Sequence, residues 1–516
     1  MNKSNSKSKK KNNAPVKKGE IVKLQIESLA PGGQGVAKLN GFPIFVDRVA
    51  PQDSIEAEVY DQRKSFALAK TVKLLEPGPG RAEPVCPVFD RCGGCQWQHL
   101  SYAAQLEAKK EIVTQTLERI GGLDKTLVQE PLGAKHQIRY RNKVQFPVSI
   151  SSKDGNLCAG YYEKNSHRLV DIDTCPVQPE DLDHMLACVK DACREQQLSV
   201  YDENTHDGLL RHIILRRSDA NKEVLLTLVV NLKGTEELDD PLLKRFKTVA
   251  AKMMGTFPQV AGFCLNFNAT RGNRILSDQT VCLVGSAVIE EVLQSKRDEE
   301  KRLRFRLSTN SFFQIHSDQT TVLLDKIREE IGELNKEAPP VVVDAYAGVG
   351  TIAMWLADGA RTVYAIEENR FAVADGRNNV LLNGITNIDF REGKVEAVLQ
   401  KLQEDGIEVD ILVLDPPRKG LSESVIDSVL KIGPDKLIYV SCNPSTLARD
   451  LKKLEAGEID ESGREVDTAE GNTKNSGYKT VRVTPIDMFP QTYHVESVAC
   501  LVRKNSDGSF RNMEKI

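Results

Sequence analysis

The sequence predicts a multidomain α/β protein with an N-terminal β-barrel, a central α+β domain and a C-terminal doubly wound sheet. Three observations lead to this fold class. The chain has 516 residues, which is too long for one hydrophobic core. Short alternating strands broken by glycine turns occupy the chain up to about residue 78. From about residue 315, apolar strand-like runs alternate with amphipathic helical patterns.

The overall composition places few limits on function. The formal net charge is −3, so a nucleic-acid partner has to be argued from local patches. No apolar run approaches the roughly 18–20 residues that cross a bilayer, and the N-terminus lacks the apolar core of a secretion signal. Eleven cysteines, an odd number scattered over a long chain, indicate reduced thiols. We therefore expect a cytoplasmic protein with no membrane partner.

The N-terminal region predicts a tail followed by a small barrel. Residues 1–19 are rich in lysine, asparagine and serine, which is typical of a disordered basic tail. In residues 20–78, alternating runs such as Ile21–Ile26 are broken by turns such as Pro31–Gly35, which predicts a five-stranded barrel of the OB type. Such barrels often bind oligonucleotides, so we expect RNA binding here, with a purely structural cap as the alternative.

Residues 79–310 mix helical and strand patterns and form the predicted central domain. Three basic runs occur in it, at Lys135–Lys143, Arg211–Arg217 and Lys301–Arg306. The first run includes Tyr140, so it suits phosphate contacts together with base stacking. A plain solvated strand face is the alternative.

Residues 311–516 predict the doubly wound sheet. An amphipathic helix over Thr320–Leu334 precedes a buried strand at Val341–Asp344. Further strands are expected at Thr362–Glu367, Ile388–Phe390, Ile411–Asp415 and Leu437–Ser441. Residues 456–478 contain almost no large apolar side chains, and we expect a flexible surface insertion there.

A glycine-containing loop, Asp344–Gly350, follows the first buried strand and suggests a cofactor site. Its glycines allow a ligand to approach the backbone, but it lacks the third glycine of a dinucleotide fingerprint and the Gly-Lys-Ser/Thr of a phosphate loop. Glu367 ends the next strand, where a carboxylate can accept both hydroxyls of a ribose. These features suit S-adenosylmethionine, which has no phosphate; a solvent-exposed strand end is the alternative for Glu367.

The segment Asp415-Pro416-Pro417-Arg418 closes another strand. Asp/Asn-Pro-Pro followed by an aromatic residue is typical of enzymes that methylate exocyclic amino groups. Arg418 stands in place of that aromatic residue, so methylation of an amine loses support.

Cys442 is the predicted nucleophile. It lies in the run Ser441-Cys442-Asn443-Pro444, between a strand and a helix, at the edge of the sheet where ligands of such folds bind. The helix N-terminus is expected to lower the pKa of the thiol, and a small buried hydrophobic side chain is the alternative. A thiolate that adds to C6 of a pyrimidine activates C5 toward a methyl donor. The reaction also needs a base, and His494 and Glu496 both qualify because alternation puts them on one face of a strand.

Three motifs in this order resemble the RNA uracil-C5 methyltransferase family: Asp-Pro-Pro-Arg, Ser-Cys-Asn-Pro-x-Thr-Leu-Ala-Arg-Asp and Asp-Met-Phe-Pro-x-Thr-x-His-x-Glu. The resemblance implies a Rossmann-like methyltransferase domain with Cys442 as nucleophile and Glu496 as general base. It places the S-adenosylmethionine contacts at Gln314, Tyr346, Thr351, Glu367 and Asp415. Thr351 stands where many relatives carry asparagine, and its hydroxyl could serve instead. Gly393 replaces a polar residue that is common there.

Four cysteines form a second candidate site: Cys86, Cys92, Cys95 and Cys175. Four thiolates suit either an iron–sulfur cluster or tetrahedral zinc, although the five-residue gap after Cys86 fits a zinc ribbon less well. One branch of the family carries a [4Fe–4S] cluster with this spacing, together with an N-terminal barrel called a TRAM domain. By that resemblance the four cysteines hold a [4Fe–4S] cluster; unligated thiols are the alternative.

The same branch is similar to enzymes that modify 23S ribosomal RNA. The resemblance therefore implies a monomeric enzyme acting on a uridine of 23S rRNA, with transfer RNA as the alternative substrate. Two other hypotheses are an amino-methyltransferase with an incidental cysteine and a non-catalytic RNA-binding protein. The first predicts that Cys442→Ala keeps activity, and the second predicts that the chain does not bind S-adenosylmethionine.

Overall fold

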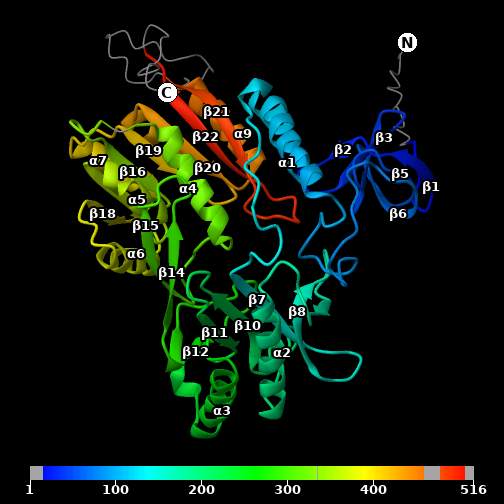
Figure 1. Ribbon diagram of the computed structural model, residues 1–516. Coiled ribbons are helices and arrows are strands. Elements are labelled where there is room, and N and C mark those ends of the chain that lie inside the picture. The colour runs from blue at the N-terminus through cyan, green and yellow to red at the C-terminus, as the bar shows by residue number, and fades with distance from the viewer. Residues whose placement is uncertain (1–14, 334, 458–476, 506–516) are drawn as a thin grey trace, which may run out of the picture. The chain divides into compact units, whose positions relative to one another are not determined.

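The computed structural model describes residues 15–333, 335–457 and 477–505 (Figure 1). The chain forms two compact units. The first contains the residues up to Phe89, Cys95–Ile112 and Gln491–Tyr493, and the second contains the remainder. Most of the predicted basic tail, residues 1–14, and most of the predicted insertion, residues 458–476, lie outside the described residues.

A six-stranded sheet forms the core of the first unit, with the order β1-β5-β6-β4-β3-β2. Its strands are β1 (Ile21–Gln25), β2 (Ser28–Leu29), β3 (Gly35–Leu39), β4 (Phe42–Val46), β5 (Ser54–Gln62) and β6 (Ala67–Glu76). Alternate side chains point inward, and Leu24, Ile44 and Ile55 are among those that are buried. We expected five strands; the additional strand β2 has two residues, too few to produce an alternating pattern.

Segments distant in the sequence complete the first unit. Trp97 is fully buried, and its Nε1 donates a hydrogen bond to the carbonyl of Gly33 at 3.1 Å. The side chain of Gln105 accepts a hydrogen bond from the main-chain N–H of Gln491 at 2.9 Å. The main-chain N–H of Trp97 donates to the carbonyl of Gln491 at 3.0 Å. These contacts hold the short segment Gln491–Tyr493 in the same unit as the barrel.

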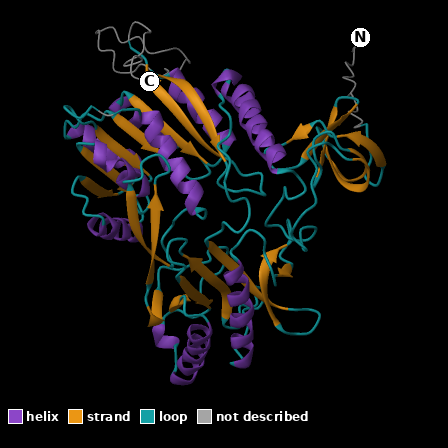
Figure 2. Cartoon of the chain, in the orientation of Figure 1, coloured by secondary structure: helices purple, strands orange, loops and turns teal. Residues whose placement is uncertain are grey.

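The second unit contains a mixed seven-stranded sheet with the order β13-β12-β11-β10-β7-β8-β9 (Figure 2). The strands are β7 (Lys143–Ile150), β8 (Leu157–Tyr162), β9 (Leu169–Asp171), β10 (Leu210–Arg217), β11 (Val224–Val230), β12 (Val260–Phe267) and β13 (Thr280–Gly285). The helices α2 (Glu180–Glu195) and α3 (Asp240–Thr256) belong to the same unit. The helix α1 (Tyr102–Thr116) lies in the first unit up to Ile112. A separate two-stranded ribbon follows, made of β14 (Val288–Gln294) and β15 (Arg302–Ser308).

The third large sheet, also in the second unit, confirms the predicted doubly wound architecture. Its order is β18-β17-β16-β19-β20-β22-β21. The parallel strands are β16 (Val341–Ala345), β17 (Thr362–Glu367), β18 (Ile388–Glu392), β19 (Ile411–Leu414) and β20 (Lys436–Ser441). Two antiparallel strands, β21 (Tyr478–Ile486) and β22 (Glu496–Arg503), extend the sheet beyond β20.

The parallel strands are connected by α5 (Thr351–Leu356), α6 (Arg370–Leu382), α7 (Val395–Glu404) and α8 (Glu423–Ile432). In the chain, α4 (Ser317–Ile331) precedes β16, and α9 (Pro444–Ala456) follows β20. Short helical turns lie at Leu117–Gly121, Lys125–Leu127, Thr235–Glu237 and Ala357–Gly359. Every residue of β16 and β19 is buried, which explains why these strands appear in the sequence as continuous apolar runs. Within the described residues, no helix has the length and apolar character needed to cross a membrane.

Candidate active site

A cavity of about 940 Å³ opens at the carboxyl edge of the third sheet. Residues that follow four neighbouring parallel strands line it: Tyr346 after β16, Glu367 at the end of β17, Asp415 after β19 and Cys442 after β20. Parallel strands present their carboxyl ends at one edge, which is why side chains far apart in the sequence meet here. Gln314 and Glu496 line the same cavity.

The glycine loop is held in an unusual backbone conformation. Tyr346, Gly348 and Gly350 all have positive φ angles, at 67°, 56° and 77°. A Cβ atom on Gly350 would lie 2.6 Å from the ring of Phe390, so a larger residue would require that ring to move. The strained Tyr346 is the kind of outlier that concentrates at ligand sites, and its side chain lines the cavity.

Glu367 clamps this loop through its carboxylate. One oxygen accepts a hydrogen bond from the N–H of Gly348 at 2.9 Å, and the other accepts from the N–H of Asn369 at 2.8 Å. Each carboxylate oxygen can accept a second bond, so the orientation is fixed while capacity for a ligand hydroxyl remains. Thr351, the first residue of α5, is not among the described residues that line the cavity.

Two buried acids lie at the carboxyl ends of neighbouring strands, Asp344 in β16 and Asp415 after β19. Burial raises the pKa of Asp344 to about 8 and that of Asp415 to about 7. Asp344 is fully buried, and only one of its oxygens has a hydrogen-bond partner, the N–H of Ala353 at 2.8 Å. Buried carboxyls with unused acceptor capacity favour a ligand that brings positive charge and donors. The sulfonium and ammonium groups of S-adenosylmethionine fit this environment.

Cys442 lies in the turn between β20 and α9. Asn443 caps the helix by accepting a hydrogen bond from the N–H of Ser445 at 3.1 Å. The same side chain donates to the carbonyl of Arg418 at 3.0 Å, so the cysteine turn and the Arg418 loop are joined. Cys442 is half-buried and faces the cavity.

The expected low pKa of the Cys442 thiol is wrong for this structure. Burial, followed by the negative charge of Glu496, raises the pKa to about 11, and Arg418 opposes the shift. The sequence could indicate the helix terminus but not the burial or the two carboxyls, because Glu496 and Asp415 come from other parts of the chain.

Glu496 is the first residue of β22 and is buried, with 3% of its surface exposed. Burial, followed by the charge of Asp415, raises the pKa of this carboxyl well above its ordinary value, and Arg418 again opposes the shift. His494 lines the cavity as well and packs edge-on against Phe489, with ring centroids 6.0 Å apart. Both candidate bases therefore reach the site.

Two acidic residues near the cavity, Asp450 and Asp375, accept hydrogen bonds that hold neighbouring segments in place. The sequence did not indicate either role. Asp450 of α9 is fully buried and accepts hydrogen bonds from the N–H of Leu421 and the hydroxyl of Tyr439, both at 2.8 Å. It thereby holds the loop that follows Arg418. Asp375 of α6 lines the cavity and accepts a hydrogen bond from the Ser311 hydroxyl at 2.6 Å.

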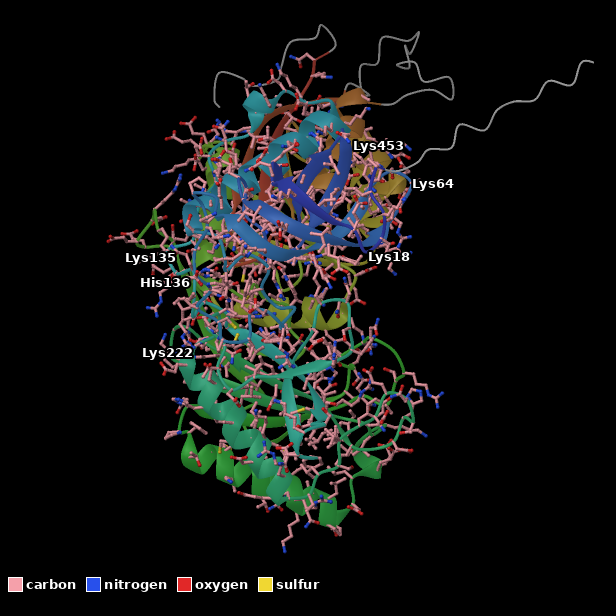
Figure 3. All side chains as sticks on the ribbon, turned by 90° about the vertical axis from the view of Figure 1, so that its right-hand side faces the viewer. Lys18, Lys64, Lys135, His136, Lys222 and Lys453 are labelled. Atoms are coloured by element: carbon pink, nitrogen blue, oxygen red, sulfur yellow. The ribbon has the colours of Figure 1, made fainter. Side chains whose placement is uncertain are left out.

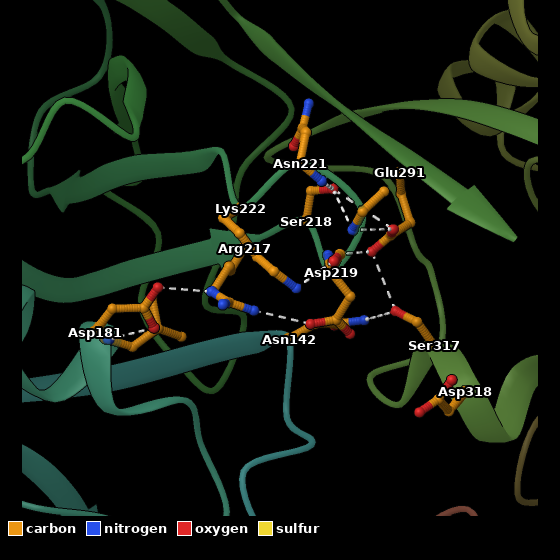
Figure 4. A network of polar contacts seen from close by, with 12 residues as sticks. Asn142, Asp181, Arg217, Ser218, Asp219, Asn221, Lys222, Glu291, Ser317 and Asp318 are labelled. Carbon is orange, nitrogen blue, oxygen red and sulfur yellow. Dashed lines mark hydrogen bonds and ion pairs between the residues drawn. The ribbon is translucent and has the colours of Figure 1, made fainter.

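The segment that carries Gln314 is fixed by a polar network (Figure 4). The side-chain amide of Asn142 donates to the carbonyl of Gln314 at 3.1 Å and to the Ser317 hydroxyl at 3.0 Å. The Ser317 hydroxyl donates in turn to Glu291 at 3.1 Å, which also accepts the N–H of Asp219 at 2.8 Å. Asn142 belongs to the first basic run, so part of that run supports the cavity wall.

We expect Asn142→Ala to raise the Kd for S-adenosylmethionine about tenfold, because a buried carbonyl and hydroxyl lose their donor and the Gln314 segment loosens. Isothermal titration calorimetry would measure this Kd. Asn156→Ala is the matched control, since Asn156 is exposed and its amide donates to the nearby Asp154. An unchanged Kd for Asn142→Ala would contradict this role for the network.

Two residues of the basic runs, Tyr140 and Arg217, contact other residues of the protein. Tyr140 is buried and stacks on His316 with ring centroids 4.6 Å apart, so the prediction that Tyr140 stacks on an RNA base is wrong. Arg217 pairs with Asp181 at 2.7 Å and with Asp219 at 2.9 Å (Figure 4). The sequence pattern shows charge but not the acidic partner that neutralises it.

Other basic residues remain exposed. Lys135 and His136 lie at the surface (Figure 3). In β15, residues Arg302 and Arg304 are exposed because every second side chain points outward, as the alternative hypothesis of a solvated strand face states.

The four candidate metal-ligating cysteines are divided between the two units: Cys86 and Cys95 belong to the first, and Cys92 and Cys175 to the second. Among the described residues, no group of three or more His, Cys, Asp or Glu side chains is arranged to hold a metal ion. One local feature suits a thiolate ligand, since the N–H of Gly94 donates a hydrogen bond to the sulfur of Cys92 at 3.3 Å.

Family models and individual known proteins match this chain. The family model for tRNA (uracil-5-)-methyltransferase matches residues 274–461, and the TRAM domain model matches residues 15–72. An uncharacterized RNA methyltransferase of Halalkalibacterium halodurans is 38% identical over 495 residues, which are 96% of this chain and 100% of the relative. The chain belongs to the RNA (uracil-5-)-methyltransferase family.

Two further proteins match nearly the whole length of this chain. An uncharacterized RNA methyltransferase of Gloeobacter violaceus is 40% identical over 94% of this chain and 97% of its own. The tRNA (uracil-54, C5)-methyltransferase of Pyrococcus abyssi, solved with S-adenosyl-L-homocysteine, superimposes with a TM-score of 0.67 at 26% identity. It covers 93% of this chain and 100% of its own. The protein is thus an S-adenosylmethionine-dependent RNA methyltransferase with an N-terminal TRAM domain, as the motifs predicted.

Proposed function

We propose that this methyltransferase acts on C5 of a uridine in RNA, with Cys442 as nucleophile and Glu496 as general base. The observation that supports the proposal most directly is the shared cavity. A thiol, a buried carboxyl and the acidic wall formed by Glu367 and Asp415 open into the same space at the carboxyl edge of the sheet.

The chemistry requires each of these residues in turn. The Cys442 thiol gives its proton to solvent in the open cavity. The sulfur electron pair then forms a bond from Sγ to C6 of uracil, while the C5–C6 double-bond pair moves into an enolate. S-adenosylmethionine, when bound, would supply the methyl group to C5, and the electron pair of the broken S–CH3 bond would stay on its sulfur as a neutral thioether. Glu496 removes the remaining C5 proton, and the returning electron pair breaks the Sγ–C6 bond and frees the cysteine.

Arg418 balances the charges of this site. It lowers the pKa of the Cys442 thiol and of the Glu496 carboxyl, against the burial that raises both. A sulfonium brought into the cavity adds a second positive charge and favours the thiolate further. In this proposal the methyl donor is held by Gln314, Tyr346, Glu367 and Asp415. Thr351 is assigned no more than an indirect role through the first turn of α5.

RNA that contains 5-fluorouridine at the target position tests the mechanism. Fluorine replaces the proton that Glu496 would remove, so the Sγ–C6 bond cannot be released and a covalent complex should accumulate. Denaturing gel electrophoresis and mass spectrometry would detect the adduct and locate it on Cys442. Turnover of the uridine RNA without an adduct on the fluorinated RNA would refute covalent catalysis.

The affinity for S-adenosylmethionine is expected to rise with pH between about 6 and 8. Asp415 has a pKa of about 7, and its ionised form attracts the cationic ligand, so binding strengthens as Asp415 loses its proton and weakens as the pH falls below 7. Calorimetry in buffers of different ionisation enthalpy should also show proton release on binding. Asp415→Asn should reduce the steepness of the profile near pH 7, while the contribution of Asp344, whose pKa burial raises to about 8, remains. An unchanged profile in this variant would contradict the assignment.

We propose 23S ribosomal RNA as the substrate, acted on in the cytoplasm by a monomer. The support is the resemblance of the barrel together with the cysteine set to the branch that modifies this RNA. Mapping 5-methyluridine in ribosomal and transfer RNA from a deletion strain would test the choice. Loss of the nucleotide from transfer RNA alone would contradict it, and light scattering would test the monomer.

We further propose that Cys86, Cys92, Cys95 and Cys175 hold a [4Fe–4S] cluster. The four thiolates, their spacing and the hydrogen bond from Gly94 to Cys92 support a cluster ligand set. The cluster would cross-link distant chain segments, and the proposed methyl transfer uses no redox step. Anaerobically purified protein should be brown and contain about four iron and four sulfide ions per chain. A colourless preparation that contains zinc would overturn the proposal.

A further inference from the structure

The loop between β12 and β13 contributes residues to the catalytic cavity. Arg274, Leu276 and Asp278 from this loop line the same space as Cys442, although the loop belongs to the mixed central sheet. Arg271 and Arg274 are exposed. The basic runs that the sequence singled out do not include either arginine.

Two buried asparagines hold the loop in one shape. Asn268 is 1% exposed, and its amide donates to the carbonyls of Arg274 and Ile275 at 2.7 and 2.9 Å. Asn266 is fully buried and exchanges hydrogen bonds with the main chain of Ser277, at 3.0 Å to its carbonyl and 2.9 Å from its N–H. A loop fixed by such contacts loses little conformational entropy when it binds a ligand.

The base of the loop is also secured from its sides. Arg211 is buried and donates to the carbonyl of Thr270 at 2.8 Å. The amide of Asn310 donates to the carbonyl of Ser277 at 2.6 Å, and Asn310 itself lines the cavity. The loop is thereby connected to the segment that leads to Gln314.

Residues of both charges line the cavity. Glu367 and Asp415 belong to the site assigned to the methyl donor, and the cationic residues that line the cavity are Arg274, Lys394, Arg418 and Lys419. Arg274 forms an ion pair with Asp278, and both side chains are more than half exposed. An exposed pair of this kind contributes little to stability, so Arg274 can exchange its carboxylate for a phosphate.

We propose that residues 269–279 form a preformed RNA clamp, in which Arg271 and Arg274 bind phosphates of the nucleotides that flank the target uridine. The proposal rests on the proposed function, because the flanking nucleotides are defined by a uracil placed at Cys442. The clamp would hold the strand at the cavity mouth while the target base enters the cavity.

The test is the salt dependence of binding to a single-stranded RNA that contains the target uridine. Removing one basic side chain that contacts a phosphate should reduce the slope of log Kd against log salt concentration by about 0.7. We expect Arg271→Ala and Arg274→Ala each to raise the RNA Kd about five- to tenfold at ~0.1 M salt and to lower the slope by that amount. In turnover, the loss should fall on KM for RNA rather than on kcat.

Two further variants make the test specific. Lys247→Ala removes an exposed cation of α3 that does not line the cavity, and it should change the slope by much less. Asp278→Asn removes the competing carboxylate and should lower the RNA Kd. Equal slope changes in the arginine and Lys247 variants, or unchanged slopes in the arginine variants, would overturn the clamp. Formation of the 5-fluorouridine adduct by the unaltered enzyme would show that such a failure concerns the clamp and not the catalytic proposal.

Discussion

Replacing Cys442 with alanine is expected to lower kcat for RNA methylation by roughly 10⁴-fold or more. C5 of uracil is a weak nucleophile until a group adds at C6, and Cys442 is the thiol that lines the cavity beside Glu496. Transfer of a labelled methyl group to unmodified target RNA would measure the loss. Binding of S-adenosylmethionine should remain, because the acidic wall of the cavity is unchanged.

Cys188→Ala provides the matched control for this experiment. Cys188 is a partly buried cysteine of α2 that does not line the cavity, and its replacement should leave kcat near the unaltered value. If Cys442→Ala retained a comparable rate, covalent addition would be refuted. Methylation of an exocyclic amine would then become the leading hypothesis.

Glu496→Gln is expected to lower kcat by roughly 10²–10⁴-fold and to change which step limits the reaction. The amide cannot accept the C5 proton, so the methylated RNA should remain bonded to Cys442. A covalent complex should therefore accumulate with ordinary uridine RNA and carry one transferred methyl group. Quenched-flow sampling and mass spectrometry of the complex would follow it.

His494→Ala distinguishes the two candidate bases. His494 lines the cavity, but its ring packs against Phe489, and we expect a smaller loss of kcat and no accumulated complex. Accumulation in His494→Ala together with normal release in Glu496→Gln would move the general base to His494.

The third sheet could be predicted from the sequence because its central strands β16, β19 and β20 are almost entirely buried on both faces. Runs such as Val341–Asp344 and Leu437–Ser441 are apolar almost throughout, and acidic residues stand at or just after the ends of β17, β18 and β19. The same argument placed Glu367, Asp415 and Cys442 at one edge. Strand β2 escaped prediction because a two-residue strand has no period.

The sequence predictions that were wrong concern residues whose contacts are made by partners far away in the sequence. Tyr140 seemed suited to base stacking because its neighbours in the sequence are basic, yet its ring is covered by His316, which is 176 positions later. Asn142 supports Gln314 across a similar separation. The prediction for the pKa of Cys442 was wrong for the same reason. Burial and carboxyls that follow or begin other strands raise this pKa more than the local helix terminus lowers it. Periodicity and motif spacing report local geometry, and none of these partners is local.

The segment Gln491–Tyr493 has a consequence for the order of events during biosynthesis. It is held by Trp97 and Gln105 of the first unit, while Glu496 begins only three residues beyond its end. A ribosome completes the barrel early, but the barrel unit stays unfinished until a stretch close to the far end of the polypeptide has emerged. The proposed proton acceptor therefore reaches its place late, after the strands that carry the other residues of the cavity have been synthesised.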